Sequence, residues 1–534
     1  MKRLFTIIAA TTLLASCGNQ LPKEYSESKS LPSIYPDYVG VTIPVNIAPL
    51  TFEMDTPAEE MAVRFSAGDE EMICNGNKVQ PDIDDWRQLT KAAQGKAVKV
   101  EVYTRSQGQW TRFKPFDIYV STDSIDPYIS YRLIAPSYVS YEDLTINQRC
   151  LENYDESVVY DNMLCSDGPA GQCINCHNYQ QYNPDRMQFH ARENLGGTLV
   201  AYDGKMRKVN MKNDSTLSAG VYPTWHPWLK LIVYSTNQTH QTFHTMKKNK
   251  IEVFDTQSDL IAYDVEKNEA TNIESGPDEM EVFPFWAPDG KTLYFCSAHF
   301  EYKDTIDQGL EFIGRAEECK YNIYKKSFDP ETLQFGPREL VFDATAIDKS
   351  ATFPRVSPDG RFLLFTLAEY GVFHIWHHDA DLWMLDLRAP SNLPQQEKAP
   401  SNLPQLGEAS EADNTQPTSP CRGQQEGAYP LTELNSPDTE SYHSWSSNGR
   451  WVVFSSRRND GNYTRPFIAH IDKDGHSGKP FELPCTAPDY HRQFMRCYNI
   501  PEFMKGPVTI QPQEFADVLK RDAEPVKYVQ KLSK

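Results

Sequence analysis

The chain has few positive charges, no long apolar run beyond its N-terminus and no familiar catalytic motif. No later segment of its 534 residues reaches the ~18 apolar residues of a transmembrane helix, so we expect none. Lys and Arg total 53 against 73 Asp and Glu, a net charge of -20, which argues against nucleic-acid binding. There is no G-x-S-x-G elbow, P-loop or dinucleotide fingerprint, so no self-contained enzyme is indicated.

The N-terminus has the features of an export signal. Two basic residues precede a mostly apolar run over residues 4–15, which is too short to span a membrane. Cys17 follows small residues and resembles the lipidated cysteine of the bacterial lipobox; an ordinary cleaved signal with a chance cysteine is the alternative. Gly18 in place of Asp implies release to the outer membrane. We therefore expect a lipid anchor, and no other membrane contact, at the periplasmic face of the outer membrane.

The most informative motif is C-x-x-C-H, formed by Cys173, Cys176 and His177. This spacing is the attachment signature of c-type haem: two thiols add to the porphyrin vinyl groups and the histidine is the proximal iron ligand. Attachment of this kind occurs outside the cytoplasm, which agrees with the export signal. The sequence therefore predicts one covalent haem c.

Other residues near the motif are candidates for completing a haem site. His190 is the favoured second iron ligand, with Met187 as the alternative. Arg186 and Arg192 are candidates for propionate contacts, although both are equally well explained as solvated surface arginines. Cys173, Cys176, His177 and His190 together could instead hold zinc. A redox dithiol and a structural disulfide loop also stay open.

A repeat organises the C-terminal half: an aromatic residue, a tight turn and an apolar strand recur four times. The copies begin at Tyr222-Pro223, Phe283-Pro284, Phe353-Pro354 and Tyr442-His443. The middle two copies turn at Asp289-Gly290 and Asp359-Gly360, which are typical hairpin turns. A single antiparallel sheet of this size cannot bury both faces, and radial stacking of such sheets makes a β-propeller. These copies resemble the blades of TolB-like propellers. Four blades are clear in the sequence, and we expect five or six in all.

The domain division follows from these features, and the fold class is mainly β. We expect a signal peptide at 1–16, a tether at 17–37, a β-sandwich-like domain at 38–136, a haem-binding segment at 137–194, a propeller at 195–505 and a tail at 506–534. A Pro/Ser/Gln-rich tract at 388–427 reads as a disordered insertion. Because few residues separate His190 from the first expected hairpin, we expect the haem at the junction of the N-terminal domain and the propeller.

Two functions agree with the sequence. The first is a lipid-anchored periplasmic haem protein that transfers electrons or senses redox state, with a redox partner docking near residues 165–195. The second is a non-redox scaffold that binds envelope proteins, as the resemblance to TolB-like propellers implies, with structural haem or zinc at the motif. His240 and His244, four residues apart, and the histidines of the segment 373–379 are weaker metal candidates at a propeller mouth.

Overall fold

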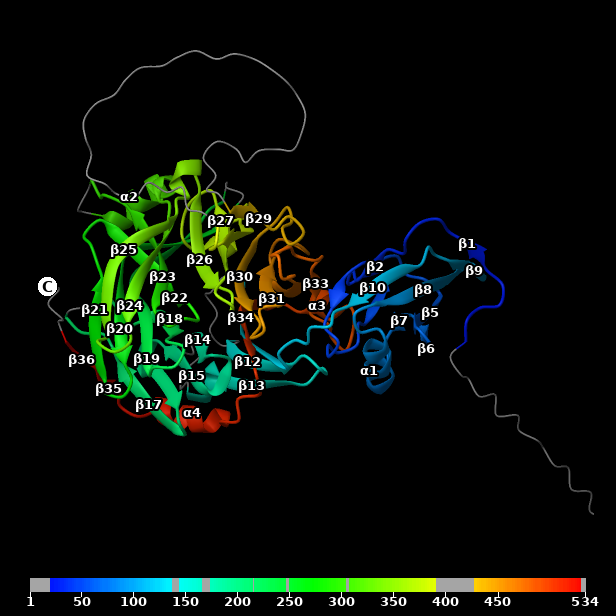
Figure 1. Cartoon of the computed structure of the whole chain (residues 1–534), viewed down its shortest axis with the longest axis horizontal. Helices are drawn as coiled ribbons and strands as arrows, with labels where there is room; N and C mark the ends of the chain where they lie inside the picture. The colour runs from blue at the N-terminus through cyan, green and yellow to red at the C-terminus, as the bar shows by residue number, and fades with distance from the viewer. Residues whose placement is uncertain are drawn as a thin grey trace, which may run out of the picture.

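The computed structural model describes residues 20–136, 144–165, 173–214, 216–245, 249–303, 307–389 and 427–529. The signal peptide at 1–16, the lipidation site Cys17 and nearly all of the insertion expected at 388–427 lie outside these ranges. The fold is mainly β, as the sequence predicts, and Figure 1 shows a smaller N-terminal domain beside a larger propeller. No helix in the described ranges is long and apolar enough to cross a membrane.

The N-terminal domain consists of two sheets and one helix. Its larger sheet contains β1 (Ser26–Glu27), β3 (Thr42–Ile43), β5 (Glu60–Ala67), β6 (Glu70–Gly76), β8 (Ala97–Ser106), β9 (Gln109–Arg112) and β10 (Phe116–Val120), and the smaller contains β2 (Ile34–Tyr35), β4 (Phe52–Met54) and β7 (Lys78–Val79). Helix α1 (Ile83–Ala92) begins where the Asp82 carboxylate accepts two backbone N–H groups. Strand β1 pairs with β9, and β2 pairs with β4. The second half of the expected tether is therefore part of the folded domain.

The propeller contains six units of four antiparallel strands. Five of these units are continuous in the chain. The first is β14 (Ile174–Gln180), β15 (Asn183–Ala191), β16 (Gly197–Tyr202) and β17 (Lys205–Asn210), and the second is β18 (Val221–Trp225), β19 (Leu231–Phe243), β20 (Ile251–Asp264) and β21 (Glu269–Glu274). The third is β22 (Glu279–Trp286), β23 (Thr292–His299), β24 (Asn322–Asp329) and β25 (Gln334–Phe342), the fourth is β26 (Ser350–Val356), β27 (Phe362–Ala368), β28 (Asp381–Asp386) and β29 (Ala428–Pro430), and the fifth is β30 (Glu440–Trp445), β31 (Trp451–Ser456), β32 (Arg465–His470) and β33 (Phe481–Glu482). The four hairpins expected from the sequence repeat are β18–β19, β22–β23, β26–β27 and β30–β31.

The remaining unit combines strands from distant parts of the chain. β11 (Tyr128–Ile134), β12 (Thr145–Cys150) and β13 (Glu156–Asp161) are joined by β34 (Cys497–Met504), which pairs antiparallel with β11. The boundary expected between 136 and 137 therefore does not separate two domains, because β11 and β12 are neighbours in one propeller sheet. Likewise, residues 173–191 are not a separate haem-binding segment but the first two strands of a propeller sheet.

Each sheet has the same irregularity in its innermost strand. Six non-glycine residues take a left-handed φ of 47° to 58° there: Cys176, Tyr222, Phe283, Phe353, Tyr442 and Ile500. A shift of pairing register accompanies each of them, as in a β-bulge. The next residue is Pro in four strands and His in two, His177 and His443. The Cys176-His177 pair of the haem motif is thus the local equivalent of the aromatic-Pro pair that begins the repeat.

The innermost strands surround a shared axis. β34, β14, β18, β22, β26 and β30 each contact the next, and β30 contacts β34. Aromatic side chains at the bulges pack against one another, with ring centroids 4.8 Å apart for Tyr222 and Phe283, 5.2 Å for Phe283 and Phe353, and 5.4 Å for Phe353 and Tyr442. The axis is therefore largely filled by aromatic rings.

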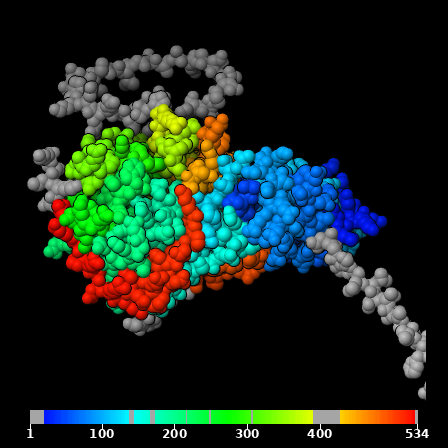
Figure 2. Space-filling model, turned by 60° about the horizontal axis from the view of Figure 1, so that its bottom comes forward, coloured from blue at the N-terminus to red at the C-terminus, as the bar shows by residue number. Residues whose placement is uncertain are grey.

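The C-terminal residues expected as a tail are bound to the propeller. Helix α4 (Pro512–Leu519) packs against β13, β16 and β17. Beyond it, β35 (Glu524–Pro525) pairs with β17 and β36 (Lys527–Tyr528) pairs with β21. Figure 2 shows this red segment crossing the outside of the green sheets. It covers the outer edges of two neighbouring sheets, which would otherwise offer unpaired backbone groups.

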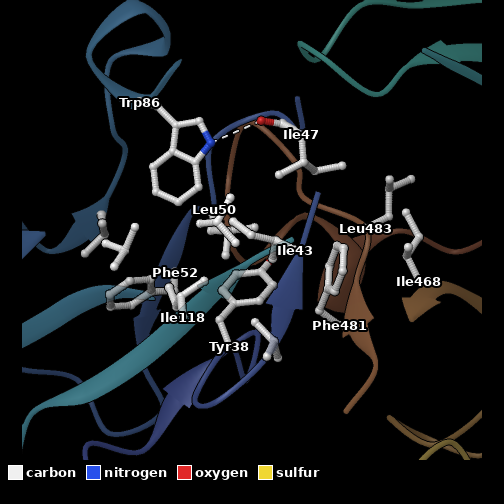
Figure 3. Close-up of a cluster of buried hydrophobic side chains, with 14 of the residues drawn as sticks. Tyr38, Ile43, Ile47, Leu50, Phe52, Trp86, Ile118, Ile468, Phe481 and Leu483 are labelled. Carbon is white, nitrogen blue, oxygen red and sulfur yellow. Dashed lines mark hydrogen bonds between the residues drawn. The ribbon is translucent and has the colours of Figure 1, made fainter. Parts of the chain in front are cut away.

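The N-terminal domain and the propeller share one hydrophobic core. Tyr38, Ile43 and Leu50 from the domain pack in one cluster with Ile468 and Phe481 of the propeller (Figure 3). The indole of Trp86 closes one side of this cluster and donates its N–H to the carbonyl oxygen of Ile47, 3.1 Å away. Because these side chains are almost completely buried, the two parts are held together by core packing rather than by a flexible linker.

Candidate functional site

A cavity of about 260 Å³ opens at one end of the propeller axis, and we call it the mouth cavity. Its lining comes from the innermost strands and from loops above them: Arg132, Cys173, Asn175, Arg192, Tyr222, Thr239, His240, Gln241, Val253, Phe373, Trp376, Tyr442 and Ile500. A second, much smaller cavity of about 20 Å³ lies on the same axis and includes Cys176 and His177. Tyr222 and Ile500 line both, so the two cavities are adjacent.

The two cysteines of the C-x-x-C-H motif lie beside these cavities as free thiols. Cys173 is 6% exposed and Cys176 is 2% exposed. The Cys176 thiol donates to the side-chain oxygen of Asn175, 2.6 Å away, and accepts the backbone N–H of Tyr222 at 3.5 Å. Burial raises the pKa of Cys176, against the opposing effect of this N–H group and of Arg192. The Cys176 thiol is therefore protonated at neutral pH.

His177 is buried between two propeller sheets. Its ring centroid lies 6.1 Å from that of Tyr179, and the backbone of Ser130 and Ile500 faces the ring. Neither ring nitrogen makes a hydrogen bond of good geometry with any described residue. Burial, and secondarily Arg132, lowers the pKa of His177 to about 3. The imidazole is therefore neutral, and its nitrogens have no hydrogen bond of good geometry from the residues that the structure describes.

Two guanidinium groups flank the thiols. Arg132, on β11, is 5% exposed and its Nη1 lies 3.5 Å from the carbonyl oxygen of Ile174. Arg192 follows β15, and its backbone N–H donates to the carbonyl oxygen of Cys173 at 3.0 Å. Burial acts to lower the pKa of Arg192, but the neighbouring Cys173, Tyr222 and Cys176 outweigh burial, and the pKa is raised. Positive charge therefore gathers at the cysteine side of the mouth cavity.

The structure separates the other candidate residues. His190 lies on β15 opposite Asn175, is 4% exposed, and its Nδ1 is 3.1 Å from the hydroxyl of Thr198. Burial and Arg192 lower the pKa of His190 to about 3. Met187 is fully buried in the hydrophobic core beneath the sheet. Arg186 is at the other end of β15, where it bonds Gln180 at 2.9 Å and Asp203 at 2.8 Å.

The expected site residues are thus brought together only in part. Cys173, Cys176, His177 and Arg192 gather near the mouth cavity, whereas Arg186 is held elsewhere. The four residues considered for zinc do not form a cluster: no group of three or more His, Cys, Asp or Glu in the described ranges is arranged to hold a metal ion.

Sequence reasoning missed several residues of the mouth cavity. Arg132 carries no motif, and it reaches the cavity because β11 and β14 belong to adjacent sheets. Phe373 and Trp376 lie at η5 (His374–Trp376), a single turn after β27. His240, noted in the sequence as one of a pair, is exposed at the cavity, and its ring centroid lies 5.5 Å from that of Phe254. Only tertiary structure places these side chains around one space.

Comparisons with known proteins assign the chain to no family. No protein-family model and no curated protein matches the chain. A puromycin hydrolase mutant structure is similar at 8% identity with a TM-score of 0.34, covering 66% of this chain and 45% of that chain. A prolyl oligopeptidase B from Galerina marginata is similar at 9% identity with a TM-score of 0.33, covering 66% and 44%. The chain spans less than half the length of these two proteins, so their activities are not carried over to it.

Proposed function

We propose that this chain is a haem c protein that transfers or senses single electrons at the mouth cavity. The observation that carries the proposal is the meeting of two free thiols, Cys173 and Cys176, with the unsatisfied imidazole of His177 beside a cavity flanked by two guanidinium groups. This set contains the donors that covalent haem requires.

The residues present fit such a group chemically. Cys173 and Cys176 would form the two thioethers, and a neutral His177 would supply the proximal nitrogen. Arg132 and Arg192 suit the two propionates, because planar guanidinium groups pair well with carboxylates. Bound haem would supply one-electron redox chemistry at iron. The aromatic walls formed by Tyr222, Trp376 and their neighbours would exclude water, which is one of the factors that set a redox potential.

A second axial ligand is best sought at the cavity itself. Each histidine has a hydroxyl neighbour, Thr256 at 3.3 Å from Nε2 of His240 and Thr198 at 3.1 Å from Nδ1 of His190. His240 lines the cavity and is exposed, whereas His190 is 4% exposed and Met187 is inside the core. We therefore place His240 ahead of His190 and Met187 as the sixth ligand. The variants His240→Ala and His190→Ala distinguish them, since only loss of a true ligand changes the low-spin absorption spectrum and the potential.

The decisive experiment is expression of the full chain with c-type maturation factors, followed by the pyridine haemochrome spectrum of the purified protein. We expect one covalent haem per chain, lost in the Cys173→Ala/Cys176→Ala variant. Arg192→Gln should shift the redox potential, while Arg186→Gln, its matched control at the far end of β15, should not. A folded protein without haem, with both thiols open to alkylation, would refute the proposal.

The cell compartment and partner belong to the same proposal. The lipobox-like Cys17 would anchor the mature protein at the periplasmic face of the outer membrane, within reach of a soluble redox partner. Labelling with a radioactive fatty acid, lost in Cys17→Ala, tests the anchor.

A second candidate, a non-redox binding scaffold, is favoured by one observation. Cys176-His177 occupies a bulge that the other five innermost strands also have, and Tyr442-His443 places a second histidine at the same position. Nε2 of His443 lies 3.2 Å from the carbonyl oxygen of Leu364, within hydrogen-bond distance of the backbone. If His177→Ala unfolds the protein without any spectral signature in the wild type, the scaffold is the better description.

A further inference from the structure

A buried cluster beneath the N-terminal domain joins Cys485, His491 and Glu482. The Cys485 sulfur lies 3.6 Å from Nε2 of His491, and Nδ1 of His491 lies 2.5 Å from a carboxylate oxygen of Glu482. Glu482 is at the end of β33, and His491 is on α3 (Tyr490–Gln493). The order thiol, imidazole, carboxylate is the arrangement that activates a cysteine nucleophile.

A buried positive charge supports ionisation of this cysteine. Arg149 is 4% exposed, and its Nη1 donates to the Cys485 sulfur at 3.5 Å. Among the described residues Arg149 forms no ion pair with a carboxylate; its other hydrogen-bond partner is the carbonyl oxygen of Pro484. A buried charge without a counter-charge is costly, so a thiolate at Cys485 would balance Arg149.

The other titratable groups near the sulfur are tyrosine phenols and the Glu482 carboxylate, and the carboxylate of Glu156 acts on three of these phenols. Burial and the nearby Cys485 both act to raise the pKa of five tyrosines around the sulfur: Tyr38, Tyr131, Tyr154, Tyr490 and Tyr498. Tyr498 also hydrogen-bonds Nε2 of His491 at 3.2 Å. Burial alone would raise the pKa of Cys485, but His491 and Arg149 outweigh it and lower that pKa. The pKa of His491 is correspondingly raised, to about 9.

We infer that Cys485 is a thiolate at neutral pH and a site of oxidation by hydrogen peroxide. The cysteine is 7% exposed, which admits a small uncharged oxidant and excludes bulky reagents. In the reaction the sulfur attacks one peroxide oxygen, an S–O bond forms and the O–O bond breaks. The departing hydroxide takes a proton from the His491 imidazolium, which gives sulfenic acid and water. The sulfur loses two electrons, and the peroxide gains them.

The chain provides its own controls. Cys296 and Cys319 are fully buried, and burial raises the pKa of both thiols, as expected for inert structural cysteines. Neither has an imidazole and a guanidinium within hydrogen-bond distance of its sulfur. Oxidation should therefore discriminate between Cys485 and these two thiols within one protein.

In the test, the folded full-length chain is oxidised with hydrogen peroxide at pH 7 and the excess peroxide is removed with catalase. The protein is then unfolded in the presence of dimedone, which traps sulfenic acid, and analysed by peptide mass spectrometry. We expect the dimedone adduct at Cys485 and none at Cys296 or Cys319, with at least a tenfold slower reaction in His491→Gln. An unfolded sample, in which all three thiols become equivalent, checks the reagents. No adduct at Cys485 in the folded wild type would overturn the inference.

A second measurement does not depend on access or on the folding of a histidine variant. The difference in ultraviolet thiolate absorbance between wild type and Cys485→Ser should persist below pH 7. A midpoint at or above the ordinary thiol value of about 8.5 would overturn the assignment of a thiolate. Neither experiment depends on haem, so the result is independent of the proposed function.

Discussion

Phe481→Ala tests whether the N-terminal domain and the propeller unfold as one unit. Phe481 is fully buried on β33, in the core that the domain shares with the propeller (Figure 3). Truncation removes its ring from contact with side chains of both parts and leaves a cavity. Buried Phe→Ala changes cost about 3–5 kcal/mol, so we expect a loss of about 4 kcal/mol in the free energy of unfolding.

The size of the shift in Tm distinguishes the two cases. Unfolding entropy is roughly 2.1 cal/mol/K per residue, so a cooperative unit of ~500 residues loses about 4 °C for 4 kcal/mol. If the N-terminal domain of ~110 residues unfolded alone, the same loss would lower its own transition by about 17 °C. Because the core is continuous, we expect the smaller shift and a single transition.

Differential scanning calorimetry of the full chain measures both quantities. Tyr119→Ala is the control, since Tyr119 is 50% exposed on β10 and its truncation should change stability by less than about 0.5 kcal/mol. An early, separate transition that moves by more than about 10 °C in Phe481→Ala while the main transition stays fixed would refute the shared-core argument.

Three further predictions concern charge and the C-terminus. Burial, with Glu274 and other nearby carboxylates, raises the pKa of Glu281 to about 9. The protonated side chain therefore contributes its full stability below about pH 4.5, and this contribution is lost as the pH rises toward 9. At pH 7 we expect Glu281→Gln to have a free energy of unfolding roughly 2 kcal/mol above that of the wild type, measured by urea titration. Glu101 is buried between Arg64 and Arg112, which outweigh burial and lower its pKa, so its contribution to folding stability is present at neutral pH and is lost on acidification. Glu101→Gln should lower the free energy of unfolding by about 3 kcal/mol at pH 7. The control Asp84→Asn, at the exposed pair with Arg87, should lower it by less than ~0.5 kcal/mol. Removal of residues 523–534 should leave the chain folded but speed amide hydrogen exchange in β17 and β21 about tenfold, with β26–β28 unchanged; equal rates would show that β35 and β36 do not protect these edges.

The candidate site was only partly readable from the sequence. The C-x-x-C-H spacing identifies Cys173, Cys176 and His177 without any structure, because the motif is local. Arg132 could not be found in this way, since its place near the thiols depends on the pairing of β11 with β34. The same holds for the cluster at Cys485, where Arg149 is 336 positions away in the chain. Convergence of such distant residues leaves no mark in a linear pattern.

What the sequence by itself determined is the mainly β fold and four of the propeller sheets. Their aromatic residues, Asp-Gly turns and apolar strands are local signals, which depend on backbone conformation and on alternation of buried and exposed faces. Tertiary structure alone decided that Cys176-His177 and Ile500-Pro501 are two more copies of the same bulge, and that strands from both ends of the chain complete one sheet. The physical reason is that pairing between distant strands is chosen by the burial of whole faces, which no short stretch of residues specifies.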